Sequence, residues 1–334
     1  MKKEIKRILI ILIITTMLMA CGKNTGDSES QNEVKENEET IWLLDKETKY
    51  TLSGNGVDLK LSGYKLYEYN SLGNETKMTE YDADGNQIYV EENEYINENA
   101  PKTKITYNNK GEVEKRQEYT FDTLPDPCKM EVVQYNGDDE EEYSMEIEFD
   151  KDGKPVNGVE YGYLFGTKIE IDVEIEYLGS NLKSMYLYMK GDSDNRPVME
   201  LECDNNGNII NRKSYNFLLG TINSEVEIKY DSNNNKTEER KYDSSGEITL
   251  IKKYEYDENN HLIRTDEKDS EGELIDWIEY EYDENGNKIK ETAIKANEEI
   301  IYVIEYEYSE AVLDLKGRAR NIFDNENVSE LGIF

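Results

Sequence analysis

The stretch YEYDENGNKIKE, residues 280–291, contains the unit that decides the fold. Tyrosine alternates with glutamate before the turn, and this period of two is typical of a strand with two different faces. Asp283 favours a turn because its carboxylate accepts hydrogen bonds from nearby backbone amides. Gly286 tolerates the left-handed backbone that a short hairpin loop needs. The stretch is therefore predicted to form two antiparallel strands joined by a tight turn.

Copies of this unit recur along most of the chain, among them YNSLGN at Asn70 and YDADGN at Asp82. Near the end the turns follow each other at alternate steps of 12 and 14 residues: Asp231, Asp243, Asp257, Asp269 and Asp283. Subtracting about four loop residues leaves strands of roughly nine. We predict an all-β fold, a long antiparallel meander of about twenty strands. Open sheets rarely exceed about ten strands, so it is expected to curl into a shell or barrel, or to fold into two layers.

The segments YDENNHLIR (256–264), YDENGNKI and YDADGNQI resemble the YD repeats of the Rhs family. The strands of that family wind into hollow β-shells. The similarity covers most of residues 64–309, and it implies a repeat module on a secreted or surface protein.

The first twenty residues differ from the rest. A basic start, MKKEIKR, precedes thirteen largely apolar residues, ILIILIITTMLMA, which are too few to span a bilayer stably. Residues 18–21, LMAC, are similar to the lipobox of bacterial lipoproteins, in which the cysteine is diacylglycerylated and begins the mature chain. The resemblance implies a lipid anchor on Cys21 and a place on the extracytoplasmic face of the bacterial cell membrane. An ordinary secretory signal with a chance cysteine is the alternative.

Composition divides the chain into three parts. Residues 1–20 are expected to be the lipoprotein signal peptide. Residues 21–40 are polar, with hardly any aliphatic residues and no aromatic residue before position 41, and are predicted to be a disordered tether. Residues 41–334, which begin with IWLLD, are expected to form the β-hairpin repeat domain.

Charge limits the choice of partners. Aspartate and glutamate total 74 against 39 lysines and arginines, a net charge of −35. Such a surface repels phosphate backbones, so no nucleic acid partner is expected. Acidity also keeps a long sheet protein soluble, and basic proteins or cations suit it better electrostatically.

Motifs for catalysis and metal binding are scarce. DADG, DKDG and DENGN are read as turns rather than calcium loops, so no metal or cofactor is expected. His261 is the single histidine and no Gly-x-Ser-x-Gly accompanies it, which favours a protein that is not an enzyme. Cys128 and Cys203 are compatible with a disulfide, and a small buried thiol at Cys203 is the alternative.

Successive turns lie at opposite ends of a meander, so turns 26 residues apart share one end. The tyrosines that precede these turns, Tyr230, Tyr256, Tyr282 and Tyr308, are expected to form a row. They either pack the sheet or stack on a sugar or protein surface. The sequence favours a non-enzymatic binding or structural module that recognises a glycan, peptide or envelope protein. A carboxylate-dependent hydrolase and an Rhs-like shell or export module are the alternatives.

Overall fold

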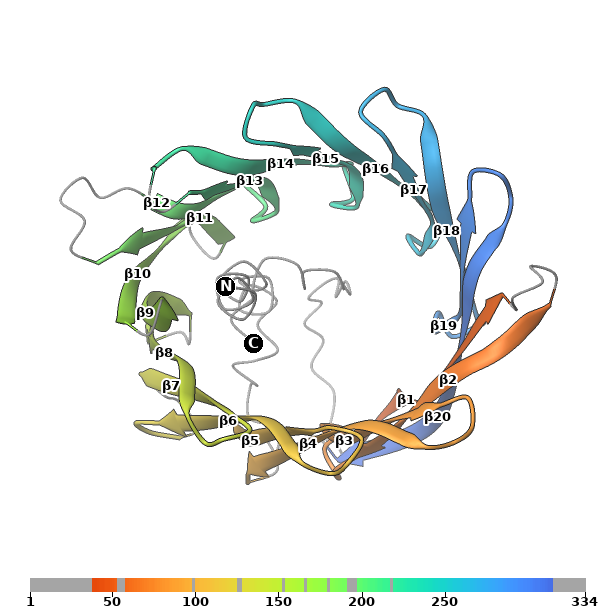
Figure 1. The fold of residues 1–334 in the computed structure, drawn as a ribbon, viewed down its shortest axis with the longest axis horizontal. Helices are drawn as coiled ribbons and strands as arrows, with labels where there is room; N and C mark the ends of the chain where they lie inside the picture. The colour runs from red at the N-terminus through yellow and green to blue at the C-terminus, as the bar shows by residue number, and fades with distance from the viewer. Residues whose placement is uncertain are drawn as a thin grey trace, which may run out of the picture.

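Twenty antiparallel strands form one closed ring in the computed structural model (Figure 1). The structure describes residues 38–52, 58–97, 100–124, 128–151, 154–164, 167–178, 181–190, 197–216 and 219–314. The expected signal peptide and Cys21 lie outside these residues. The first strand begins at Glu38, three residues before the boundary expected at position 41.

The strands follow one another along the chain without a helix among the described residues. They are β1 (Glu38–Leu52), β2 (Leu59–Tyr69), β3 (Glu75–Asp82), β4 (Gln87–Ile96), β5 (Ala100–Tyr107), β6 (Val113–Phe121), β7 (Lys129–Asn136), β8 (Glu141–Phe149), β9 (Pro155–Leu164), β10 (Thr167–Leu178), β11 (Asn181–Met189), β12 (Pro197–Cys203), β13 (Ile209–Tyr215), β14 (Ile222–Tyr230), β15 (Lys236–Tyr242), β16 (Ile248–Tyr256), β17 (Leu262–Lys268), β18 (Leu274–Tyr282), β19 (Lys288–Lys295) and β20 (Ile300–Asp314).

The meander closes through its first strand. Each strand from β2 to β20 pairs with its neighbours in sequence, and β1 pairs with both β2 and β20. Thr48 is opposite Tyr64 on one side and Glu305 on the other. The predicted all-β meander of about twenty strands is confirmed. Of the two expected arrangements, the barrel is correct and the two-layer sheet is wrong, because closure satisfies both edge strands.

The turns are built as the sequence predicts. In the turn at Asp283, the amide of Gly286 donates to the Asp283 carbonyl at 3.1 Å, and the Asp283 amide donates to the Asn287 carbonyl at 2.9 Å. The carboxylate Oδ1 accepts the amides of Asn285 and Asn287 at 2.9 and 2.8 Å. Gly286 has a φ of +82°. The strand register slips by one residue next to the turn, as a β-bulge requires.

The Asn287 side-chain amide and the backbone amides lower the pKa of Asp283, although partial desolvation opposes them. Asparagine replaces glycine at the left-handed position in two equivalent turns, at Asn234 and Asn260. Asparagine tolerates this conformation better than other residues with a side chain. Seen along the barrel axis, the turns at one end lie inside the ring and those at the other end splay outwards (Figure 1).

Candidate site on the inner wall of the barrel

One face of the sheet forms the inner wall. Directly opposed residues in neighbouring strands have side chains on the same face of the sheet. Tyr306 is opposite Glu47, and following such pairs from strand to strand identifies the residues of this face around the whole ring. Side chains converge on the concave face of a closed sheet. On this face Glu291 has 14% of its side chain exposed, whereas Glu281 and Glu307 on the other face have 58% and 62% exposed. The face that carries Tyr306 and Glu291 is therefore the inner one.

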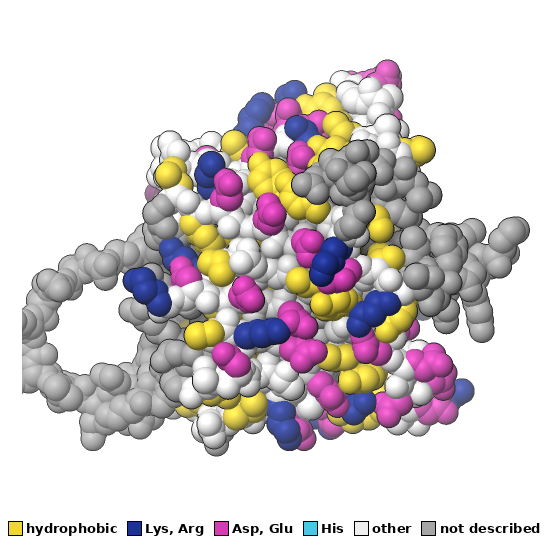
Figure 2. All heavy atoms as spheres, turned by 90° about the vertical axis from the view of Figure 1, so that its left-hand side faces the viewer, with side chains coloured by type: hydrophobic (Ala, Val, Ile, Leu, Met, Phe, Trp, Pro, Cys, Tyr) yellow, Lys and Arg dark blue, Asp and Glu magenta, His cyan; other side chains and the backbone are white. Residues whose placement is uncertain are grey.

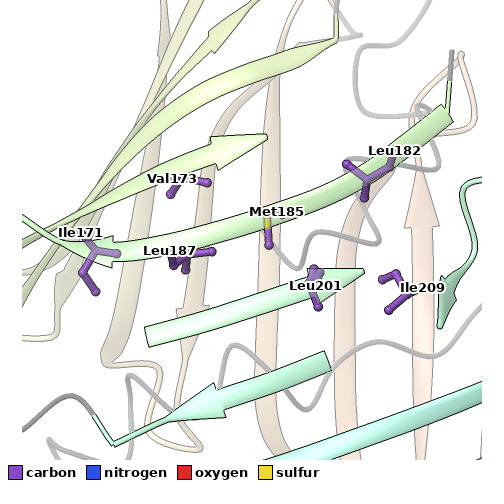
Figure 3. Packing of buried hydrophobic residues seen from close by; sticks show 7 residues of the cluster. All are labelled: Ile171, Val173, Leu182, Met185, Leu187, Leu201 and Ile209. Atoms are coloured by element: carbon purple, nitrogen blue, oxygen red, sulfur yellow. The ribbon is translucent and has the colours of Figure 1, made fainter. Parts of the chain in front are cut away.

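Between β7 and β13 the inner wall is apolar, and we call this part the apolar arc. Its buried residues are Met130, Val132, Met145, Ile147, Phe149, Ile171, Val173, Leu182, Met185, Leu187, Leu201 and Ile209. Figure 3 shows seven of them, which come from the neighbouring strands β10 to β13. The outside of this wall is different, because acidic and basic side chains are interspersed over it (Figure 2).

The rest of the inner wall, on β1–β6 and β14–β20, carries tyrosines and glutamates among apolar and basic side chains, and we call it the polar arc. The hydroxyl of Tyr302 donates to Glu291 at 2.8 Å, and that of Tyr306 donates to the second oxygen of the same carboxylate at 3.2 Å. Lys288 forms an ion pair with Glu291 at 3.0 Å, and its Nζ lies 4.4 Å from the centre of the Tyr306 ring. Burial and the Glu291 carboxylate raise the pKa of both tyrosines, so they remain neutral hydrogen-bond donors.

The polar arc continues on the early strands. The hydroxyl of Tyr67 donates to Glu47 at 3.4 Å. Burial, and then the Glu91 carboxylate, raise the pKa of Glu75. Burial beside Glu75 raises the pKa of Tyr95 to about 12. These pairs bring together residues from strands that are adjacent in the ring, so this wall presents hydroxyl donors and carboxylate acceptors at close spacing.

Glu160 is an acid inside the apolar arc. It lies on β9 opposite Met145 of β8 and Ile171 of β10, and only 8% of it is exposed. Burial raises the pKa of its carboxyl to about 7. Sequence analysis did not single out Glu160. One feature of the sequence does mark it: in the run GVEYG, residues 158–162, a glycine lies two residues before and two residues after the acid, on the same face of the strand.

Of the tyrosines predicted to form a row, Tyr230, Tyr256 and Tyr282 end strands at one rim. The prediction that Tyr308 precedes a turn is wrong, because β20 continues past it to Asp314 and pairs with β1. Three of the four hydroxyl groups are seen to bond to the backbone. Tyr230 donates to the carbonyl of Ile209 at 3.1 Å, and Tyr308 donates to that of Lys288 at 3.0 Å. Tyr282 donates to the Leu262 carbonyl at 2.9 Å. Tyr256 ends β16 at the equivalent position. These bonds fasten each hairpin to its neighbour, and the proposed ligand contact of the row stays a prediction.

Amide side chains connect the loops on this rim. Asn235 donates to Asn260 at 2.9 Å, which links the loops that start at Asp231 and Asp257. In the same way Asn208 donates to Asn234 at 3.1 Å. The turns that the sequence placed at one end of the meander therefore do lie side by side.

His261 has a structural position in this rim. Its Nδ1 lies 3.1 Å from Oδ2 of Asp257, as the side-chain amide of Asn287 lies 2.9 Å from Oδ2 of Asp283. The imidazole also stacks on Tyr282, with ring centres 4.6 Å apart. The histidine thus fills a place that asparagine fills in the neighbouring repeats.

We expect the free energy of unfolding of His261→Asn to be close to that of the wild-type protein, because the asparagine side chain can donate the same hydrogen bond to Asp257. His261→Ala is expected to lower the free energy of unfolding by about 1 kcal/mol through loss of the hydrogen bond. Chemical denaturation of both variants checks this. Equal losses in the two variants would show that the ring stacking, rather than the hydrogen bond, is what matters.

Other sequence expectations can be located as well. Cys128 and Cys203 are not joined by a disulfide: the first is exposed and the second half-buried. Within the described ranges no cluster of three or more histidine, cysteine or acidic side chains is arranged to hold a metal ion. The same ranges contain no helix long and apolar enough to cross a membrane.

No protein-family model matches the chain, and no curated protein matches it. Among solved structures it is similar to a porin-like protein from Bacteroides vulgatus, at 10% identity and a TM-score of 0.31, over 80% of this chain and 99% of that one. A porin-like protein from Bacteroides uniformis gives 12% identity and a TM-score of 0.33 over 80% and 98%. The Tc holotoxin pore of Photorhabdus luminescens gives 12% identity and a TM-score of 0.13 over 74% of this chain and 17% of that one. At these identities and TM-scores the likeness carries no conclusion about the role of this chain.

Proposed function

We propose that the protein is a non-enzymatic binding module of the bacterial cell surface, held at the extracytoplasmic face of the membrane by a lipid on Cys21. The inner wall of the barrel is its ligand-binding surface. The observation that carries this proposal is the division of that wall into an apolar arc and a polar arc of paired tyrosines and glutamates.

The width of the ring supports this choice of surface. Twenty strands about 4.8 Å apart give a circumference near 100 Å, and hence a diameter of about 30 Å or more. Inward side chains cannot fill a ring of that width, since barrels of 16 to 18 strands already enclose a channel. A ligand inside meets apolar contacts on one side and hydrogen-bonding groups on the other, as ligand sites generally provide.

The ligand class follows from the wall. Tyrosine rings and carboxylates suit the hydroxyl groups and apolar faces of a glycan, or the basic and apolar side chains of a peptide. The net charge of −35 favours a ligand that is neutral or cationic.

Co-purification tests the binding function. The lipidated protein is extracted from the native envelope in mild detergent and examined by native mass spectrometry, and any captured molecule is identified after denaturation. We expect a bound molecule in stoichiometric amount. If the double variant Tyr302→Phe/Tyr306→Phe no longer co-purifies with this molecule, the molecule binds at the polar arc. Repeated purification of the wild-type protein without any bound molecule would contradict the proposal.

Membrane attachment is tested separately. Cys21→Ala is expected to move the protein from the membrane fraction to the soluble fraction, because the acyl chains supply the binding energy for the bilayer. Cys128→Ala is the matched control and should remain with membranes. If Cys21→Ala still sediments with membranes, the lipid anchor is not what holds the protein there.

A further inference from the structure

Glu160 stands out on the inner wall as an acid in apolar surroundings. Its neighbours across the strands on the same face are Met145 and Ile171, and the apolar arc continues on both sides of them. Among the described residues no ion pair or hydrogen bond involves its carboxyl group. Glu160 as a residue is only 8% exposed, and an ionised carboxyl group in such surroundings costs free energy unless a partner compensates for it.

Two glycines flank Glu160 on the same face of β9. Gly158 and Gly162 lie two residues before and after it, on the same face of β9, and neither has a side chain. A Cβ atom at Gly162 would meet its nearest neighbour, Ile169, only at 3.8 Å, which is ordinary contact. A Cβ atom at Gly158 would come within 3.0 Å of the backbone oxygen of Glu146, so that position is closely packed. Neither glycine contributes a side chain beside the Glu160 carboxyl group.

Tyr143 lies next to Glu160 on the inner wall. It lies directly opposite Gly162 on β8, so its ring is a diagonal neighbour of Glu160. Burial and the charge of Glu160 raise the pKa of Tyr143, which keeps the phenol neutral. This part of the inner wall thus combines one carboxyl group and one neutral phenol within a wall of aliphatic side chains.

A primary ammonium group fits this combination. It supplies the positive charge that an ionised carboxylate needs in apolar surroundings, and it donates up to three hydrogen bonds. The ring of Tyr143 adds a cation–π contribution. A carboxylate or phosphate head would instead face Glu160 with like charge and is disfavoured.

We propose that Glu160 and Tyr143 form the head-group site for a cationic amphiphile with a primary ammonium group, whose alkyl part lies along the apolar arc. This inference rests on the proposed binding function and names the ligand class for one part of the inner wall. Glu160 forms the ion pair with the ammonium group, and Tyr143 orients it.

Binding of simple probes tests the site. Mature protein with Cys21→Ala is titrated calorimetrically at pH 7.5 with dodecylamine, dodecanol and dodecanoate, each below its critical micelle concentration. We expect dodecylamine to bind at least about tenfold more tightly than dodecanoate. Glu160→Gln is expected to weaken dodecylamine binding by about tenfold or more and to leave dodecanol binding unchanged, because only the ion pair is lost.

Two further variants separate the site from general effects. Glu174→Gln removes an exposed carboxylate from the outer face of the neighbouring strand β10 and should not change dodecylamine binding. Gly162→Leu adds a bulky side chain next to Glu160 and opposite Tyr143, and it should weaken dodecylamine binding more than dodecanol binding. Circular dichroism and the thermal midpoint verify that each variant is folded.

Three results would overturn the inference: equal binding of all three probes, an unchanged affinity of Glu160→Gln for dodecylamine, or no dodecylamine binding by the parent protein. In the first case the apolar arc is merely an apolar surface. In each case the proposed binding function is judged independently, by whether a molecule co-purifies with the native protein.

Discussion

Thr48→Pro is expected to lower the free energy of unfolding by about 3 kcal/mol or more and to open the barrel. Thr48 lies in the middle of β1, the strand that joins β2 to β20, and it is buried between Tyr64 and Glu305. Proline has no amide hydrogen, so one ladder hydrogen bond is lost, and its ring disturbs the neighbouring strand.

Opening at β1 would also change the association state. The free edges of β2 and β20 would present unpaired backbone groups, and such edges pair with other chains. Guanidinium denaturation measures the stability, and size-exclusion chromatography with light scattering measures the mass. Thr48→Val is the control, because it keeps the backbone amide and is expected to cost about 1 kcal/mol. A monomeric Thr48→Pro protein as stable as that control would argue against β1 as the closing strand.

Glu160→Gln is expected to stabilise the folded protein at pH 8 by about 3 kcal/mol and to have little effect at pH 4.5. Burial raises the pKa of Glu160 from 4.5 to about 7, so between these values the folded state binds a proton that the unfolded state has lost. The contribution of Glu160 to the free energy of unfolding is fully present below pH 4.5, where its carboxyl group is protonated. It decreases as the pH rises towards 7 and is lost above that pH. About 1.4 kcal/mol for each pKa unit gives the size of the effect.

Denaturation curves of wild-type and variant protein at several pH values between 4.5 and 8 provide the measurement. The difference between the two proteins is the relevant quantity, because other titrating groups, such as Glu75, cancel in it. Glu174→Gln, on the outer face, should follow the wild-type curve throughout. A Glu160→Gln difference that does not depend on pH would mean that the carboxyl group is solvated in the folded protein.

The candidate site was predictable only in part. The tyrosine row could be placed at one rim because the repeat length determines which turns share an end, although Tyr308 lies within β20 and not before a turn. The sequence did not identify the bonds from Tyr302 and Tyr306 to Glu291, because they depend on how β19 and β20 are aligned. The asparagine-like bond of His261 to Asp257 became evident only by comparison with Asn287 in the equivalent turn.

The sequence also did not identify Glu160, because its surroundings depend on the pairing of strands. Acidic residues alternate with apolar ones in many strands, and most of them, such as Glu281 and Glu307, face outwards. The run GVEYG does not indicate which face of β9 becomes the inner, concave face of the barrel. Only the pairing of Glu160 with Met145 and Ile171 places its carboxyl group among aliphatic side chains.

The sequence by itself determined the strands and the bends between them. Each turn is made by contacts within five residues, as at Asp283, and each strand by a local alternation, so neither needs distant parts of the chain. The tertiary structure alone decided that β1 returns to close the ring and which face becomes the inner wall. Both depend on pairing between residues 38–52 and 300–314 and on the curvature of the whole sheet, and no local pattern contains that information.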